Sequence, residues 1–182
     1  FNTPNQEFLS KKIASLENGE KALIFTSGMA AISTSIMANV KTGDHIVFQN
    51  DLYGGTRNFI QTEFDKFGIE YSFTDGLDPQ DFSNQIKDNT VGIYVETPSN
   101  PLLKIIDLKS VSSIAKEKGI WTMIDNTFSS PVNQNPIDHG IDIVLHSATK
   151  YLGGHSDISA GAVVGSESRI EKILNSARNF GG

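Results

Sequence analysis

The chain has 182 residues, of which 38% are hydrophobic and 20% charged, an ordinary composition for one globular domain with a sizeable core. Its formal net charge of -6 and its lack of a Lys/Arg run argue against surfaces for nucleic acid or anionic membranes, both of which need cationic side chains. It contains no cysteine for disulfides or thiolate catalysis, no apolar run of bilayer length and no leading secretion signal, so we expect a cytoplasmic protein.

Strands that alternate with helices are predicted along the whole chain from the periodicity of the hydrophobic residues. The expected strands are 22–25, 45–48, 69–73, 91–95, 121–124, 141–145 and 160–164, and the expected helices are 6–17, 29–40, 55–67, 79–87, 107–118 and 167–178. Such alternation implies crossover connections between parallel strands. We therefore predict one α/β domain, with a seven-stranded, mostly parallel sheet and helices on both faces.

The turn between the first strand and the second helix has the sequence Thr26-Ser27-Gly28. A strand, a Ser-Gly turn and a helix form a geometry that can hold an anion, because the first N–H groups of the helix and its dipole point at the ligand. The alternative is a plain helix N-cap at Ser27.

Two further turns follow predicted strands and carry groups suited to a planar ligand. Tyr53 is followed by Gly54-Gly55, so its ring could stack on a cofactor while the backbone approaches closely. Asn100 lies between two prolines in a rigid turn, and its amide could donate to a ring hydroxyl. The alternatives are a half-buried loop tyrosine and an ordinary Pro-rich turn.

Asp125 directly follows the apolar strand 121–124. A carboxylate at this position could pair with a pyridine nitrogen and keep it protonated, so that the ring withdraws electrons from a substrate carbanion. The alternative is an aspartate that only caps a turn or a helix.

Lys150 follows the buried strand 141–145, at the edge of an α/β sheet where ligand crevices form. The hydroxyls of Ser147 and Thr149 suit a phosphate, and the lysine amine suits a carbonyl. Pyridoxal 5′-phosphate (PLP) carries an aldehyde and a phosphate ester, and a lysine holds it as a Schiff base. The alternative is a surface lysine in a polar turn.

Other chemistries find little support in the sequence. The four histidines show no pair at metal-ligand spacing with a third ligand, so we expect no metal. G-x-S-x-G, G-x-G-x-x-G and Walker motifs are absent from the sequence, which argues against serine hydrolases, dinucleotide enzymes and P-loop ATPases. His155 is too close in sequence to Ser156 and Asp157 for a catalytic triad, and we expect it to shape the loop after Lys150.

Five motifs follow one another over nearly the whole chain. They are Ser27-Gly28-Met29, Tyr53-Gly54-Gly55-Thr56, Glu96-Thr97-Pro98-Ser99-Asn100-Pro101, Asp125-Asn126-Thr127-Phe128 and Ser147 to Asp157. Together they closely resemble the Cys/Met-metabolism (trans-sulfuration) family of PLP enzymes, which includes cystathionine γ-synthase, γ-lyase and β-lyase, methionine γ-lyase and O-acetylhomoserine sulfhydrylase. The resemblance implies the large domain of the aspartate-aminotransferase type, fold type I, whose seven-stranded sheet matches the predicted strand number.

The resemblance also implies a role for each site residue. Lys150 would bind the cofactor covalently and move protons between substrate carbons, and Asp125 would pair with the pyridine nitrogen. Tyr53 would stack on the ring, and Asn100 would contact its hydroxyl. The phosphate would be held by the main-chain amides of Gly28 and Met29 and by the hydroxyls of Ser147 and Thr149.

Compared with the family, residues 1–182 correspond to a large PLP-binding domain without the amino-terminal arm and the carboxyl-terminal domain. The arm ends where this chain starts, at Phe1-Asn2-Thr3-Pro4, and carries a Tyr-x-Arg that reaches the phosphate of a neighbouring subunit. The carboxyl-terminal domain carries an arginine for the substrate carboxylate. We therefore expect a homo-oligomer, a dimer of dimers, whose active site is completed by a neighbouring subunit.

By the same resemblance, the expected substrate is a small amino acid that contains sulfur or an activated homoserine. Gly54-Gly55 is more similar to the cystathionine enzymes than to methionine γ-lyases, which tend to carry a cysteine there, so γ-synthase or γ-lyase is the first expectation. The β-lyase, methionine γ-lyase and sulfhydrylase activities are alternatives. An alternative of another class is a catalytically incomplete module that binds PLP or another phosphate.

Overall fold

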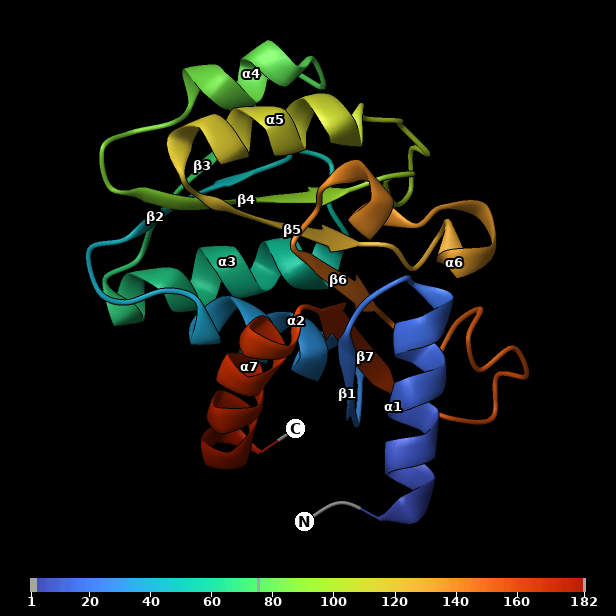
Figure 1. Cartoon of the computed structure of the whole chain (residues 1–182). Helices are drawn as coiled ribbons and strands as arrows, with labels where there is room; N and C mark the ends of the chain where they lie inside the picture. The colour runs from blue at the N-terminus through green and yellow to red at the C-terminus, as the bar shows by residue number, and fades with distance from the viewer. Residues whose placement is uncertain (1–2, 75, 182) are drawn as a thin grey trace.

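Seven strands form one sheet in the order β1-β7-β6-β5-β4-β2-β3 in the computed structural model (Figure 1), which describes residues 3–74 and 76–181. Their bounds are β1 Lys21–Phe25, β2 His45–Phe48, β3 Glu70–Phe73, β4 Thr90–Glu96, β5 Trp121–Asp125, β6 Ile143–His146 and β7 Gly161–Gly165. Four strand pairings are parallel, and β7 runs antiparallel to both of its neighbours, β1 and β6. The predicted fold class is confirmed. Phe1 and Asn2, where the resemblance puts the end of an arm, lie outside the described residues.

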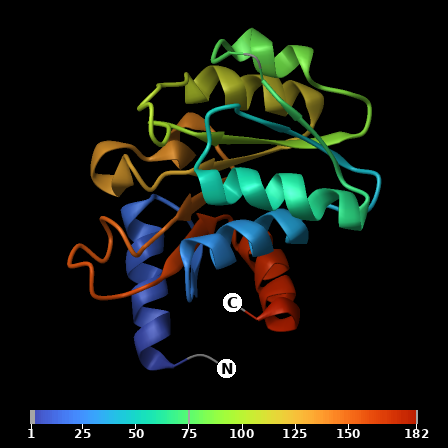
Figure 2. The ribbon, with the colours of Figure 1, turned by 180° about the vertical axis from the view of Figure 1, so that it is seen from behind.

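Helices cover both faces of the sheet, as Figures 1 and 2 show from opposite sides. One face packs against α1 (Pro4–Leu16), α4 (Pro79–Asn84) and α5 (Leu108–Lys118), and the other against α2 (Gly28–Ala38), α3 (Gly54–Phe67) and α7 (Glu167–Phe180). Alternation along the strands produces these two cores: in β2, Ile46 and Phe48 face the second group of helices, whereas Val47 faces the first. The sheet is therefore buried on both faces, which is why its strands read as nearly continuous apolar runs.

The helix ends follow from residues that satisfy free backbone groups. Thr3 and Gln6 form a capping box before α1, and the Asp107 side chain accepts the N–H of Ser110 at the start of α5. Gly68 and Gly119 close α3 and α5 in the left-handed conformation that favours glycine.

Two helical turns between β5 and β6 were not predicted: α6 (Ser130–Asn133) and the 3₁₀ turn η1 (Pro136–His139). Each has four residues, too few to show a hydrophobic period. The predicted strand 141–145 was also wrong at its start, because β6 begins at Ile143. Asp142 bonds to Thr122 through side chains instead, since its carboxylate accepts the Thr122 N–H at 2.8 Å.

The parallel arrangement gathers the carboxyl ends of β2, β4, β5 and β6 at one edge of the sheet. Glu96 and Asp125, the last residues of β4 and β5, are register partners on neighbouring strands. In Figure 1 the arrowheads of β4 and β5 point to the side where α6 lies. Among the described residues, no helix combines the length and the apolar character that a membrane span requires.

Candidate active site

A cavity of about 230 Å³ lies at this edge of the sheet. The structure brings all the predicted site residues together in its wall: Gly28, Met29, Tyr53, Asn100, Asp125, Ser147, Thr149 and Lys150. The wall also contains Ser27, which belongs to the predicted anion-holding turn, and four residues for which the sequence predicted no role: Ile32, Glu96, Thr127 and Phe128. Five separate segments of the chain therefore converge on one crevice, as expected for the carboxyl edge of an open α/β sheet.

The amino-terminal end of α2 forms one wall of the cavity. Ser27 caps the helix, with its Oγ accepting the N–H of Ala30 at 3.0 Å. A side chain at Gly28 would clash with Ser147, because a Cβ there would come within 2.7 Å of the Ser147 Cβ and 2.9 Å of its Cα. The first N–H groups of a helix have no partner within the helix. This close approach therefore brings free amides next to the Ser147 hydroxyl, a suitable donor set for a phosphate.

Thr149 has a second role that the sequence did not indicate. Its hydroxyl donates to the Ala160 carbonyl at 3.1 Å and accepts the Ala160 N–H at 3.0 Å. Thr149 thus joins the two ends of the loop between β6 and β7. Its hydroxyl proton is used in the hydrogen bond to the Ala160 carbonyl. Of the two predicted phosphate hydroxyls, Ser147 is the one whose proton is free of a hydrogen bond within the described residues.

The segments that carry Tyr53 and Asn100 are tied together by Glu96, a residue that the sequence analysis left without a role. Its two carboxyl oxygens accept the main-chain N–H of Tyr53 at 2.8 Å and that of Asn100 at 2.7 Å. The Tyr53 ring lies over Gly55, where a Cβ would come within 2.5 Å of the ring. In the sequence, Glu96 could have been found from its position at the end of an apolar strand.

Asp125 is buried at the end of β5, and one of its oxygens accepts the N–H of Thr127 at 3.0 Å. This contact is the turn-capping role considered as an alternative, and it leaves the second oxygen for another partner. Burial raises the pKa of Asp125, while the hydrogen bonds from Thr127 and the charge of His146 lower it. A cation next to this carboxylate would therefore be strongly favoured.

Burial and the neighbouring charge of Asp125 also raise the pKa of Glu96 to about 8, although the two N–H groups it accepts favour its ionised form. Folded protein then holds a proton that the unfolded chain releases near pH 4.5. Between these pH values unfolding releases a proton, so this group makes the protein less stable as the pH rises.

We expect Glu96→Gln to flatten this pH dependence. Urea unfolding of the cofactor-free protein at several pH values between 5 and 8 would measure it. The free energy of unfolding of the wild type should fall relative to the variant by up to about 1.4 kcal/mol per pH unit. Parallel curves for the two proteins would show that Glu96 is ionised throughout this range.

Lys150 lies in the turn after β6 and is exposed at the cavity. Among the described residues, no hydrogen bond or ion pair involves its amine. The loop that follows is shaped in part by His155, whose Nδ1 lies 3.1 Å from the Gly153 carbonyl oxygen, in agreement with the role predicted for this histidine. The amine is therefore available to a ligand in the cavity.

The chemistry of the cavity fits PLP. A free amine for the aldehyde, free helix amides and a hydroxyl for the phosphate, and a buried carboxylate for the pyridine nitrogen all border the same space. No cluster of three or more His, Cys, Asp or Glu suited to a metal is present among residues 3–74 and 76–181.

Comparison with known proteins agrees with this chemistry. The model of the family described as "Cys/Met metabolism PLP-dependent enzyme" matches residues 1–182. A probable cystathionine γ-synthase of Herpetosiphon aurantiacus is 44% identical over 98% of this chain and 56% of its own length, and the cystathionine β-lyase MetC of Bacillus subtilis is 46% identical over 97% and 45%.

A solved structure is similar over nearly the whole chain. The crystal structure of metB from Corynebacterium glutamicum superimposes with a TM-score of 0.95 at 40% identity, over 99% of this chain and 47% of that one. The chain thus spans about half the length of the relatives it matches. All three comparisons confirm the resemblance inferred from the five motifs, and the chain belongs to the family of Cys/Met metabolism PLP-dependent enzymes.

Proposed function

We propose that this chain is the PLP-binding large domain of a trans-sulfuration enzyme that acts on sulfur-containing or activated homoserine-type amino acids in the cytoplasm. The observation that carries the proposal is the convergence of Lys150, Asp125, Tyr53 and the amino-terminal end of α2 on one cavity. Family membership supports the cofactor. A module that binds phosphate without using the lysine would not need a buried carboxylate in the same cavity.

The residues around the cavity would divide the chemistry between them. PLP, when bound, supplies an electron-withdrawing ring that stabilises negative charge on a substrate carbon. The Lys150 amine would hold the cofactor at its aldehyde carbon and then carry a proton to and from the substrate carbons. Asp125 would hold a proton on the pyridine nitrogen, and the Tyr53 ring would cover the cofactor face. The phosphate would accept hydrogen bonds from Gly28, Met29 and Ser147, with Thr149 beside it, and Asn100 would donate to the ring hydroxyl.

The substrate is proposed at the level of a class. γ-Replacement or γ-elimination is our first choice, and β-elimination from cystathionine is the second candidate. The relatives named cystathionine γ-synthase and cystathionine β-lyase are 44% and 46% identical to this chain, so similarity supports both. The test is an assay of the full-length protein with O-acyl-homoserine plus cysteine and with cystathionine alone, in which the products distinguish the reactions. PLP binding without either turnover would overturn the proposed activity.

We further propose that a neighbouring subunit completes the site in a dimer of dimers. Lys150 is the only cationic side chain in the described part of the cavity wall, although a phosphate and a substrate carboxylate both need cationic partners. Exposed apolar side chains at this edge of the sheet support an interface there: Val132 lies on α6, and Leu102, Leu103, Ile105, Tyr151 and Ile158 lie on the neighbouring loops.

We expect the full-length protein to sediment as a tetramer, and Ile105→Asp to reduce both its size and its activity. Ile105 is 68% exposed, and a charge at this position would be costly inside an interface. Phe67→Asp is the matched control, because Phe67 is also exposed but lies at the far end of α3. Light scattering after size exclusion would measure the mass. An active monomer would refute the shared site.

The phosphate assignment predicts a large effect of Gly28→Ala and a small effect of Gly54→Ala. Both glycines begin helices, but a Cβ at Gly28 would push against Ser147, whereas a Cβ at Gly54 meets nothing within 4 Å. Displacing Ser147 would remove at least one hydrogen bond to a charged group, about 1.5–3 kcal/mol, so PLP should bind roughly 10- to 150-fold more weakly. Titration of the cofactor-free proteins with PLP would measure this, and equal affinities would contradict it.

A further inference from the structure

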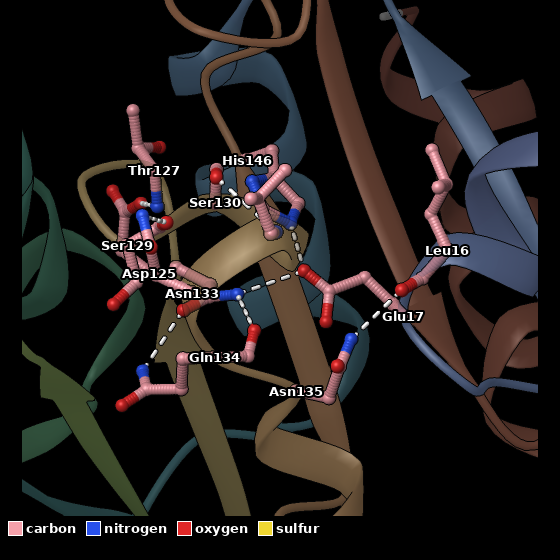
Figure 3. A network of polar contacts seen from close by, with 12 residues as sticks. Leu16, Glu17, Asp125, Thr127, Ser129, Ser130, Asn133, Gln134, Asn135 and His146 are labelled. Atoms are coloured by element: carbon pink, nitrogen blue, oxygen red, sulfur yellow. Dashed lines mark hydrogen bonds and ion pairs between the residues drawn. The ribbon is translucent and has the colours of Figure 1, made fainter.

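A buried pair of ionisable side chains, Glu17 and His146, has no role in the steps above (Figure 3). The two side chains are 0% and 1% exposed, and the His146 Nε2 lies 2.5 Å from the Glu17 Oε1. Asn126 donates its side-chain amide to the same oxygen at 2.8 Å. One carboxylate oxygen from the end of α1 thus contacts two residues that are more than 100 positions away in the sequence.

The two contacted residues are direct neighbours of the proposed cofactor residues. Asn126 follows Asp125 at the end of β5, and His146 precedes Ser147 at the end of β6. The Asn126 main-chain N–H also donates to the Leu145 carbonyl at 2.9 Å, which joins the two strand ends. Glu17 therefore holds together the ends of the two strands that present Asp125 and Ser147 to the cavity.

Gln134 extends this network to β4. The Gln134 side-chain amide donates to the Asn126 Oδ1 at 2.9 Å and to the Thr97 main-chain carbonyl at 3.1 Å. The Gln134 main-chain carbonyl accepts from the Asn126 side-chain amide at 3.0 Å. Figure 3 shows Gln134, Asp125, His146 and Glu17 within this one group of polar side chains. The ends of three adjacent strands are thus connected through one hydrogen-bonded cluster.

The cost of burying Glu17 indicates a role other than stability. Glu17 is the C-cap of α1, where a negative charge opposes the helix dipole. Its Oε2 has no hydrogen-bond partner among the described residues, and a buried carboxylate needs a cation as well as hydrogen bonds. Within the described structure, His146 is the only basic side chain that contacts Glu17. Apolar residues would fill such a position at lower cost.

We infer that Glu17 and His146 are positioning residues of the cofactor site: the His146 ring, held by the Glu17 carboxyl group, aligns the ends of β5 and β6 and so holds Asp125 and Ser147 in place for the cofactor. This inference rests on the proposed function, because Asp125 must be ionised to hold a proton on the pyridine nitrogen. Burial raises the pKa of Asp125, and the positive charge of His146 opposes that effect. Glu17 acts through His146 and does not touch the cavity wall.

The test compares full-length wild type with Glu17→Gln, His146→Gln and the double variant. Glutamine keeps the size of each side chain and a hydrogen-bonding group but removes the charge. The readouts are the dissociation constant of PLP for the cofactor-free protein and the nitrogen-15 chemical shift of ring-labelled PLP, which reports the proton on the pyridine nitrogen. We expect each single variant to bind PLP about tenfold more weakly with a shift toward the unprotonated ring, and the double variant to be no worse, because both changes remove one interaction.

Arg169→Gln is the matched control. It removes the ion pair of Arg169 with Asp142, 2.9 Å apart, next to the opposite end of β6, and should leave the PLP affinity and the nitrogen shift unchanged. Single variants that bind PLP within twofold of wild type with an unchanged shift would overturn this inference alone, as would effects that simply add. A wild-type protein that binds no PLP would overturn the proposed function and this inference with it.

Discussion

Replacing Lys150 with alanine should abolish the yellow colour that PLP acquires on the wild-type protein and reduce turnover by at least about 10³-fold. The lysine has two proposed tasks, the covalent hold on the cofactor and the transfer of protons, and general acid–base catalysis alone contributes roughly 10²- to 10⁴-fold. The structure gives the reason for choosing this lysine: Lys150 lines the same cavity as Asp125. The first measurement is an absorbance spectrum from about 300 to 500 nm, the range in which the bound cofactor absorbs.

The matched control is Lys66→Ala, which removes an exposed lysine paired with Glu63 on α3, at 2.8 Å. An exposed pair of this kind contributes about 0–1 kcal/mol, so colour and turnover should persist. If both survive in Lys150→Ala, another lysine holds the cofactor and the assignment of the whole site is wrong.

Replacing Asp125 with asparagine should weaken PLP binding by roughly 10- to 150-fold, the equivalent of about 1.5–3 kcal/mol for a hydrogen bond to a charged group. Removal of the substrate α-proton should slow as well, because the neutral amide cannot hold a proton on the pyridine nitrogen. The fold should be kept, since the asparagine oxygen can still accept the Thr127 N–H. Titration with PLP and exchange of the α-proton in deuterated water measure the two effects separately.

Asp142→Asn provides the comparison for Asp125→Asn. Asp142 precedes β6, accepts the Thr122 N–H and pairs with Arg169, so its replacement should lower stability and leave PLP affinity intact. Asp125→Asn with wild-type affinity and exchange rate would reduce Asp125 to the turn-capping residue that was its alternative interpretation.

Local patterns in the sequence predict the seven strands, the order of all helices except the four-residue α6 and η1, and the chemical class of the cavity. An apolar run such as 121–124 is a strand in almost any context that buries it on both faces, and the residue after it must lie at the sheet edge. Asp125, Tyr53 and Lys150 could therefore be predicted as neighbours from parallel topology alone. Element ends were less certain, as at β6, where Asp142 replaced a ladder contact with side-chain bonds.

Which polar groups satisfy one another across the chain depends on how the sheet and helices pack, and no local pattern reveals it. The hydrogen bonds from the Tyr53 and Asn100 main chains to Glu96 require two loops to meet at one carboxyl group. The contact of Glu17 with His146 spans 129 positions and has no local pattern, since a glutamate after a helix is usually solvated. Burial turns these pairings into strong constraints, because an unpaired charge in the interior is costly, and burial is a property of the packed sheet rather than of any segment.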